Sequence, residues 1–237
     1  MFVASVAIAE EAPIVGPTLN DMLPSFDSVR RMPIDGVNIV EMDGKVILTS
    51  NNGRFVFTNA VLYDTWNRRH LRTPDEIAKY MNVIDTQKMG LDMSLLGAIK
   101  IGSGEKVATF FVDPQCEYCA GLLQMAISDE SILNDYSINL VLLPILGEES
   151  GRLSRNLICA NIKGQMDNMA VAKALAAKSY DGVANSPSRC DDGSMERAII
   201  SAKLFGAQGV PFVINPEGRY GNAVPTDLRA FLEEGIL

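Results

Sequence analysis

The chain has 237 residues, of which 47% are hydrophobic and 21% are charged, and its formal net charge is −8 at pH 7. This composition is ordinary for a globular protein, and the negative charge argues against non-specific binding to nucleic acid or to an anionic membrane. No stretch approaches the roughly 18–20 apolar residues of a membrane span. We therefore expect no nucleic-acid partner and no membrane insertion, and a length that fits one large domain or two modest ones.

The first residues of the chain resemble the end of a secretory signal peptide. Ala7-Ile8-Ala9 fits the small-x-small cleavage pattern, and an acidic stretch that contains proline follows it. The basic segment that normally opens such a peptide is missing, so an apolar cytosolic N-terminus is the alternative. We favour a truncated signal peptide over residues 1–16 and export to an oxidising compartment, because the pattern of four cysteines also suits such a compartment.

Short alternating runs follow a helix that we predict over residues 18–31, with Pro33 just after its end. Turn signals at residues 43–44 and 51–53 separate three predicted strands, which cover residues 37–42, 45–49 and 54–58. One small sheet buries little apolar surface by itself. We therefore predict an N-terminal domain over residues 17–72 that pairs with a second copy of itself.

A helix-start signal follows at Thr73-Pro74-Asp75-Glu76. Thr73 can cap the helix, Pro74 suits its first position, and Glu76 can complete a capping box. Apolar residues then recur at helical spacing, and the pattern predicts a helix that continues to about Met89. We assign residues 73–92 to a linker helix and residues 93–237 to a catalytic domain.

The order of elements after this linker is typical of a thioredoxin fold. An apolar strand over residues 107–112 leads into a helix that begins at Cys116, and a second strand covers residues 138–146. A helical insertion comes next, and a hairpin and a helix over residues 226–234 close the chain. We predict an α+β protein whose C-terminal domain has this fold.

The motif Cys116-Glu117-Tyr118-Cys119 carries the chemistry of this sequence. It places a thiol at the start of a helix, where the backbone N–H groups and the macrodipole favour an anion. A thiolate is the nucleophile in thiol–disulfide exchange. Cys119 lies one helical turn further on, so it can close a disulfide with Cys116 or release a trapped substrate. The motif predicts a thiol–disulfide oxidoreductase that needs no cofactor.

The other two cysteines, Cys159 and Cys190, leave three alternatives open. In an oxidising compartment they can form a bridge that closes a loop of about 30 residues, which the loop-entropy model values at roughly 3–4 kcal/mol. In the cytosol they would be two free thiols. They could also complete a four-thiolate zinc site with Cys116 and Cys119, since the only histidine, His70, lies in the other domain and is expected at its surface. We expect the bridge and no metal.

Four features together resemble the DsbC/DsbG-type periplasmic protein disulfide isomerases. They are the motif Phe111-Val112-Asp113-Pro114-x-Cys116-x-Tyr118-Cys119, the Gly209-Val210-Pro211 loop, the distant cysteine pair, and the N-terminal strands that lead to a linker helix. The resemblance covers the chain from about Asp21 to its end. It implies a V-shaped homodimer, in which cystatin-like N-terminal domains pair and linker helices hold two thioredoxin domains with facing active sites.

The same resemblance assigns roles to individual residues. It implies that Cys116 is the exposed nucleophile and that Cys119 is the more buried resolving thiol. It also implies that Pro211 is a cis-proline opposite the two cysteines, and that Val210 and Tyr118 contact an extended substrate. The implied substrates are misfolded proteins that contain disulfides. The implied redox partner is a membrane thiol reductase of the DsbD type, which keeps the dithiol reduced.

Two residues depart from the pattern of these isomerases. Glu117 stands where a small residue or proline is usual, and a carboxylate beside a thiolate disfavours the anion by like-charge repulsion. We therefore expect Glu117 to make the pair less oxidising. Val210 stands where threonine is common, which is reminiscent of the oxidase DsbA. An oxidase-biased enzyme, and a dimeric holdase chaperone or assembly factor with secondary redox activity, are the alternatives.

Overall fold

The computed structural model describes residues 28–31, 36–42, 45–57, 61–66, 68–81, 83–86, 89–181, 183, 190 and 193–236. The chain divides into two compact units. The first consists of Met1–Leu62 and His70–Ile77, and the second consists of Tyr63–Arg69 and Ala78–Leu237. The predicted signal peptide lies outside the described residues. Among the described residues, no helix has the length and apolar character needed to cross a membrane.

The first unit contains a four-stranded antiparallel sheet with the order β1-β2-β3-β4. Its strands are β1 (Ser28–Arg31), β2 (Val37–Met42), β3 (Lys45–Ser50) and β4 (Val56–Phe57). The predicted meander is confirmed. The predicted helix over residues 18–31 is wrong at its C-terminal end, because Ser28–Arg31 pairs along its whole length with β2 and the ladder outweighs local propensity. Residues 18–27 lie outside the described part of the chain.

Two further elements lead out of this sheet. The strands β5 (Leu62–Asp64) and β6 (Arg69–Leu71) form a two-stranded sheet, and α2 (Pro74–Tyr80) follows them. The hydroxyl of Thr73 accepts a hydrogen bond from the backbone N–H of Glu76 at 3.2 Å, as the capping signal predicts. The Glu76 carboxylate accepts from the backbone N–H of Arg72 at 2.9 Å.

The helix α2 is shorter than the sequence pattern predicts, because it ends at Tyr80 rather than near Met89. Val83 instead forms an antiparallel bridge with Arg219, and the backbone N–H of Ile84 donates to the carbonyl of Gly218 at 2.7 Å. Ile84 is buried in the second unit. β-type pairing of two β-branched residues has therefore replaced the last turns of the predicted helix.

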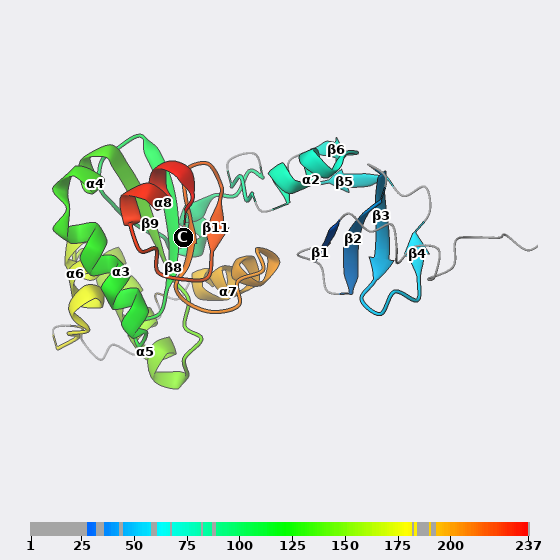
Figure 1. Ribbon diagram of the computed structural model, residues 1–237. Coiled ribbons are helices and arrows are strands. Elements are labelled where there is room, and N and C mark those ends of the chain that lie inside the picture. The colour runs from blue at the N-terminus through cyan, green and yellow to red at the C-terminus, as the bar shows by residue number, and fades with distance from the viewer. Residues whose placement is uncertain are drawn as a thin grey trace, which may run out of the picture. The chain divides into compact units, whose positions relative to one another are not determined.

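The second unit is built on a five-stranded sheet with the order β11-β10-β8-β9-β7 (Figure 1). Its central strands β8 (Lys106–Val112) and β9 (Tyr136–Leu142) run parallel, and the others pair antiparallel. The outer strands are β7 (Ile99–Ile101), β10 (Phe212–Ile214) and β11 (Tyr220–Gly221). This confirms the predicted order of a βαβ unit, a helical insertion and a C-terminal hairpin with a closing helix.

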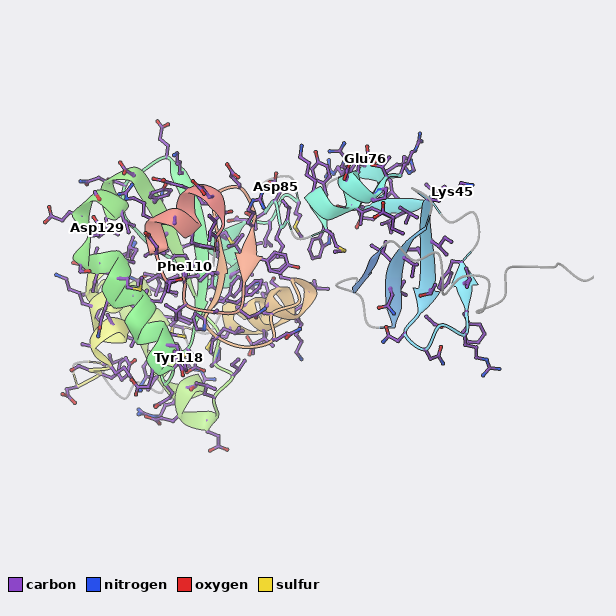
Figure 2. All side chains as sticks on the ribbon, in the orientation of Figure 1. Lys45, Glu76, Asp85, Phe110, Tyr118 and Asp129 are labelled. Carbon is purple, nitrogen blue, oxygen red and sulfur yellow. A yellow bond between two sulfur atoms is a disulfide. The ribbon has the colours of Figure 1, made fainter. Side chains whose placement is uncertain are left out.

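Helices cover both faces of this sheet because successive strand residues point to opposite sides. On one face, Phe110 and Val112 pack against the apolar sides of four helices, α3 (Glu117–Ser128), α4 (Glu130–Asp135), α6 (Asn168–Ala177) and α8 (Leu228–Glu234). On the other face, Phe111 packs with Phe212 and Phe205 against α7 (Ser194–Leu204) and the 3₁₀ helix η2 (Met93–Leu96). Figure 2 shows Phe110 among the side chains between the sheet and the helices.

The helices of the second unit are η2 (Met93–Leu96), α3 (Glu117–Ser128), α4 (Glu130–Asp135), α5 (Glu148–Ile162), α6 (Asn168–Ala177), α7 (Ser194–Leu204) and α8 (Leu228–Glu234). The crossover between the parallel strands contains α3 and α4. The helical insertion consists of α5 and α6, and α6 packs along α3 (Figure 1). The insertion therefore lies against the helix that begins at the cysteine motif.

Candidate active site

Cys116 occupies the N-cap of α3, directly after the turn that leaves strand β8. Its Sγ accepts a hydrogen bond from the backbone N–H of Cys119 at 3.2 Å. The sulfur therefore satisfies one of the free N–H groups at the positive end of the helix dipole. Both thiols are free, and both are buried, with exposed fractions of 6% for Cys116 and 1% for Cys119. The predicted thiol at a helix start is confirmed, but the exposed Cys116 that the resemblance implies is wrong, because its sulfur lies against the carbonyl of Val210 and the backbone N–H of Cys119.

The environment of Cys119 favours its protonated form. Burial raises the pKa of the Cys119 thiol, and its hydrogen bond with the Cys116 sulfur raises this pKa further. The backbone N–H of Asp113 lowers it by a smaller amount. Because the pKa of an acid has risen, Cys119 stays a neutral thiol well above neutral pH. Cys119 must therefore lose a proton before it can act as a nucleophile.

The Val210–Pro211 segment lies next to Cys116, although 94 residues separate Val210 from it in the sequence. The Cys116 thiol donates to the carbonyl oxygen of Val210 at 3.5 Å. The Val210–Pro211 peptide bond is cis, which is the isomer that the family resemblance implies. Pro211 is buried just before β10, and Val210 packs against both apolar cores. Strand β10 thus brings this loop to the cysteine motif.

Three exposed apolar side chains lie on segments that meet at the motif. Tyr118, in the first turn of α3, is 73% exposed, and Figure 2 shows it at the start of that helix. Ile145 and Leu146, in the loop between β9 and α5, are 46% and 52% exposed. Sequence reasoning proposed Tyr118 and missed the other two, because the loop reaches the motif only through the fold.

The buried carboxylate of Asp113 connects the motif to that loop. One oxygen, Oδ1, accepts from the backbone N–H of Gln115 at 2.8 Å and from the hydroxyl of Ser150 at 2.7 Å. The other oxygen, Oδ2, accepts from the backbone N–H groups of Ile145 and Leu146 at 2.9 and 3.0 Å. Asp113 is only 1% exposed. A buried charge with four donors is a fixed anchor, and here it sets the path of the chain into Cys116.

A second set of contacts reaches the motif from the end of α6. The hydroxyl of Tyr180 donates to the carbonyl of Pro114 at 2.7 Å. Lys178 donates from Nζ to the carbonyl of Gln115 at 3.1 Å, and it forms an ion pair with the Glu117 carboxylate. Burial first, and then nearby negative charges, raise the pKa of Tyr180 to about 12. Tyr180 is therefore a neutral donor throughout the physiological range.

Sequence reasoning missed Lys178, Tyr180 and Ser150, and it gave Asp113 no role beyond its place in the motif. The first three come from the helical insertion, far along the chain, and carry no local signal. Asp113 does carry one, because an acidic residue that directly ends a buried strand must find hydrogen-bond donors. His70 is exposed on β6, in agreement with the prediction of a surface residue.

Cys159 and Cys190 form a disulfide with a Cα–Cα distance of 5.6 Å. Cys159 is buried in α5, and Cys190 precedes α7. Because these two sulfurs are bonded to each other, they cannot serve as thiolate ligands to a zinc ion beside Cys116. Within the described residues, no group of three or more His, Cys, Asp or Glu side chains is arranged to hold a metal.

No protein-family model matches the sequence, and no curated protein matches it. Its structural neighbours are thiol–disulfide interchange proteins. A disulfide interchange protein from Neisseria gonorrhoeae is 22% identical, with a TM-score of 0.47 over 61% of this chain and 94% of that one. A periplasmic thioredoxin-like protein from Salmonella enterica serovar Typhimurium is 25% identical, with a TM-score of 0.47 over 59% and 90%.

A third neighbour, DsbG from Helicobacter pylori, covers more of the chain. It is 14% identical, with a TM-score of 0.41 over 78% of this chain and 91% of that one. All three TM-scores are below 0.5. These similarities therefore carry no argument about function, which rests on the residues of the site.

Proposed function

We propose that this protein is a periplasmic thiol–disulfide oxidoreductase that isomerises or reduces non-native disulfides in other proteins. The observation that carries the proposal is the free Cys116 thiol at the N-cap of α3, with its sulfur bonded to the N–H of Cys119. This is the position in a helix that best stabilises a thiolate. Val210 and Pro211, on the other side of the sulfur, are then the residues that meet the substrate chain.

The proposed reaction begins when the Cys116 thiolate attacks one sulfur of a substrate disulfide. The substrate S–S bond breaks, a mixed disulfide forms with Cys116, and the second substrate sulfur leaves as a thiolate. In isomerisation, this thiolate attacks another disulfide of the same substrate, and Cys116 is eventually released as a thiolate. In reduction, Cys119 loses its proton and attacks Cys116, which releases the substrate thiol and leaves a Cys116–Cys119 disulfide.

Burial of Cys119 favours the isomerisation branch. Since burial raises the pKa of Cys119, little of its thiolate is present near neutral pH to resolve the mixed disulfide. A longer-lived mixed disulfide gives the substrate more time to rearrange. Each reductive turnover also leaves the enzyme oxidised, so a two-electron donor of the membrane thiol reductase class, such as DsbD, is the proposed redox partner.

Apolar surface near the motif supports a polypeptide substrate. Tyr118, Ile145 and Leu146 expose large apolar side chains on the two segments that Asp113 ties together. A cavity of about 520 Å³ is lined by residues of α5 and by Gln115, Lys178 and Tyr180, which is within the usual size range of ligand pockets. The exposed side chains suit apolar segments of misfolded chains, while the cavity, whose lining is largely polar and includes Glu149, Arg152 and Asp181, suits polar groups of such chains.

Substitution of each active-site cysteine tests this function. We expect Cys116→Ala to reduce the reactivation of scrambled ribonuclease and the reduction of insulin to background levels, because no nucleophile remains. We expect Cys119→Ala to lose insulin turnover while it still forms a mixed disulfide that mass spectrometry detects. Ser128→Ala, at the opposite end of α3, is the matched control and should keep wild-type rates in both assays.

Three results would contradict the proposal. Wild-type rates in Cys116→Ala would show that this thiol does not carry out the exchange. The holdase alternative is correct if two results occur together. Cys116→Ala would prevent aggregation of an unfolded client to the same extent as the wild type, and the wild type would not reactivate scrambled ribonuclease. Rapid oxidation of reduced ribonuclease without reactivation of the scrambled form would identify an oxidase.

We further propose that the first unit is a cystatin-like dimerisation domain that pairs with a second copy. The short edge strand β4 and the residue before it expose Phe57 and Phe55, with exposed fractions of 48% and 59%. An apolar sheet edge is a ready surface for association. A dimer would place two thiol sites in one assembly, which suits a large unfolded substrate.

Sedimentation velocity tests this pairing. We expect the wild type to sediment as a dimer at micromolar concentration, and the double variant Phe55→Lys/Phe57→Lys to dissociate with a Kd about tenfold higher or more, as expected when buried aromatic contacts are lost. Lys45→Ala, an exposed change on β3 of the same sheet, is the control and should leave the Kd unchanged. A monomeric wild type would contradict the proposed role of the first unit.

A further inference from the structure

Lys178 has an unusual backbone conformation for a residue with a side chain. It caps the C-terminus of α6 in the left-handed region, with φ of 49° and ψ of 36°, and its N–H bonds back to the carbonyls of Ala174 and Leu175. Glycine is the residue that normally occupies this position, because a Cβ atom is strained there. Among the described residues, Arg68 is the only other non-glycine residue with positive φ. The strain at Lys178 therefore calls for a reason that lies in its side chain.

The side chain of Lys178 reaches the residues on both sides of Cys116. Its Nζ donates to the carbonyl of Gln115 at 3.1 Å, and the same atom forms an ion pair with the Glu117 carboxylate. The side chain is only 25% exposed, although the Glu117 side chain is 80% exposed. One ammonium group thus holds the two neighbours of the nucleophile.

The end of α6 is fixed against α3. The position of Lys178 near the motif is therefore set by its backbone as well as by its side-chain contacts. The side-chain amide of Gln124, in α3, donates to the carbonyl of Ala176 at 2.9 Å. The hydroxyl of Tyr180, two residues after Lys178, donates to the carbonyl of Pro114 at 2.7 Å. Contacts on both sides of Lys178 therefore place its backbone next to the motif.

The charges around the Cys116 sulfur explain what this contact does. Glu117 directly follows Cys116 in the sequence, and a negative charge near a thiolate disfavours it. Lys178 supplies a positive charge that offsets it. The carboxylate of Asp113 is buried and accepts hydrogen bonds from four donors. Tyr180 and Cys119 are neutral, because burial raises the pKa of each. Glu117 and Lys178 are thus the charged pair whose balance can change the stability of a thiolate at Cys116.

We propose that Lys178 is a positioning residue that sets the reduction potential of the Cys116–Cys119 pair, by holding and neutralising Glu117 beside the Cys116 sulfur. The inference rests on the proposed function, because it concerns the same dithiol. A thiolate stabilises the reduced state, so a more positive surrounding makes the pair more oxidising and a more negative one makes it less oxidising. The presence of Lys178 cancels the effect expected of Glu117 alone.

The test compares four variants of the full chain, Lys178→Met, Lys178→Gly, Glu117→Gln and Lys178→Met/Glu117→Gln. Each is equilibrated with reduced and oxidised glutathione, and mass spectrometry measures the fraction with a Cys116–Cys119 disulfide. In this equilibrium, one oxidised glutathione accepts two electrons from the dithiol and yields two reduced glutathione molecules and one protein disulfide. The rate at which iodoacetamide alkylates Cys116 at pH 6 is measured in parallel.

We expect the reduction potential and the alkylation rate to shift in one direction in the two lysine variants and in the opposite direction in the glutamate variant. Loss of Lys178 leaves Glu117 unpaired, so the disulfide should become more stable by about two- to fivefold in the equilibrium constant, the size expected for a partly exposed charge pair, and alkylation should slow. Glu117→Gln leaves Lys178 unpaired, so both quantities should move the other way by a similar factor. The double variant should return to the wild-type values.

Lys178→Gly separates this role from a structural one. Glycine relieves the strain at φ of 49°, so this variant should unfold at the same or a higher urea concentration than the wild type while it shows the same redox shift as Lys178→Met. If Lys178 only holds the chain in place, loss of either partner of the ion pair would shift the potential in the same direction, and the double variant would not recover. That result, or shifts smaller than the measurement error in all variants, overturns the inference. A wild type that shows no equilibrium with glutathione instead contradicts the proposed function.

Discussion

Replacing Asp113 with alanine is expected to lower the free energy of unfolding by about 3–4 kcal/mol, which is near the upper end of the range for single substitutions. The carboxylate is 1% exposed and accepts four hydrogen bonds, three from backbone N–H groups and one from Ser150. Its removal leaves these donors buried without an acceptor, and each unsatisfied donor costs about 1–3 kcal/mol unless water enters. The loss should therefore be much larger than that of an ordinary surface contact.

The single tryptophan provides the measurement. Trp66 packs edge-on against Phe205 in the core of the second unit, with ring centroids 5.8 Å apart, so its fluorescence in urea reports the unfolding of that unit. Asp129→Ala is the matched control, because Asp129 also accepts backbone N–H groups but lies at an exposed helix start. Its loss should cost about 1 kcal/mol.

Asp113→Asn gives a second, more conservative comparison. An amide keeps one carbonyl oxygen that can accept from two of the donors, but its NH₂ group then faces the other two. We therefore expect the free energy of unfolding of Asp113→Asn to lie between those of the wild type and Asp113→Ala. Equal stability of wild type and Asp113→Ala would show that the four hydrogen bonds contribute nothing net. The anchoring role of Asp113 would then have to be abandoned.

Removal of the Cys159–Cys190 disulfide is expected to have the second large effect. The two cysteines are 31 residues apart in the sequence, and the loop-entropy model predicts a loss of roughly 3–4 kcal/mol when such a loop is no longer closed. We therefore expect the double variant Cys159→Ala/Cys190→Ala to unfold at a clearly lower urea concentration. Burial of Cys159 adds a small packing cost to this loss.

Reduction of the wild type separates the bond from the packing. Excess dithiothreitol breaks the bond without changing any side-chain volume, so it should produce most of the same loss in stability. The variant Cys116→Ala/Cys119→Ala is the control, since it lacks the two free thiols but keeps the Cys159–Cys190 bond, and it should lose the same stability in dithiothreitol as the wild type. Identical urea midpoints for the oxidised and reduced wild type would contradict the prediction.

The sequence predicts the elements that depend on local patterns. The alternating runs of β2 and β3, the apolar strand β8 and the thiol at the start of α3 are all where their patterns place them. The errors lie where long-range pairing overrides a local pattern. Residues 28–31 pair with β2, and Val83 pairs with Arg219, so both leave the helices predicted for them.

Local patterns predict only the sulfur atoms of the site, whereas Val210 and the cis-proline Pro211 are expected from the family resemblance. Cys116 and Cys119 are three positions apart in the sequence, and this spacing alone places both at one end of a helix. Three further residues hold the chain around the thiols: Ser150, Lys178 and Tyr180. The packing of α5 and α6 places them near the motif, and no sequence spacing links them to it. Their roles follow from the fold and could not be read from composition or periodicity.

The distance along the chain between the dithiol and its supports has a consequence for biosynthesis. The side chains of Lys178 and Tyr180 contact residues that lie 61 to 66 positions earlier in the sequence. During translation, the two thiols therefore emerge well before the segment that fixes their surroundings. In a nascent chain they are an ordinary pair of cysteines, and they acquire the contacts of Lys178 and Tyr180 only after that segment has been made and has folded.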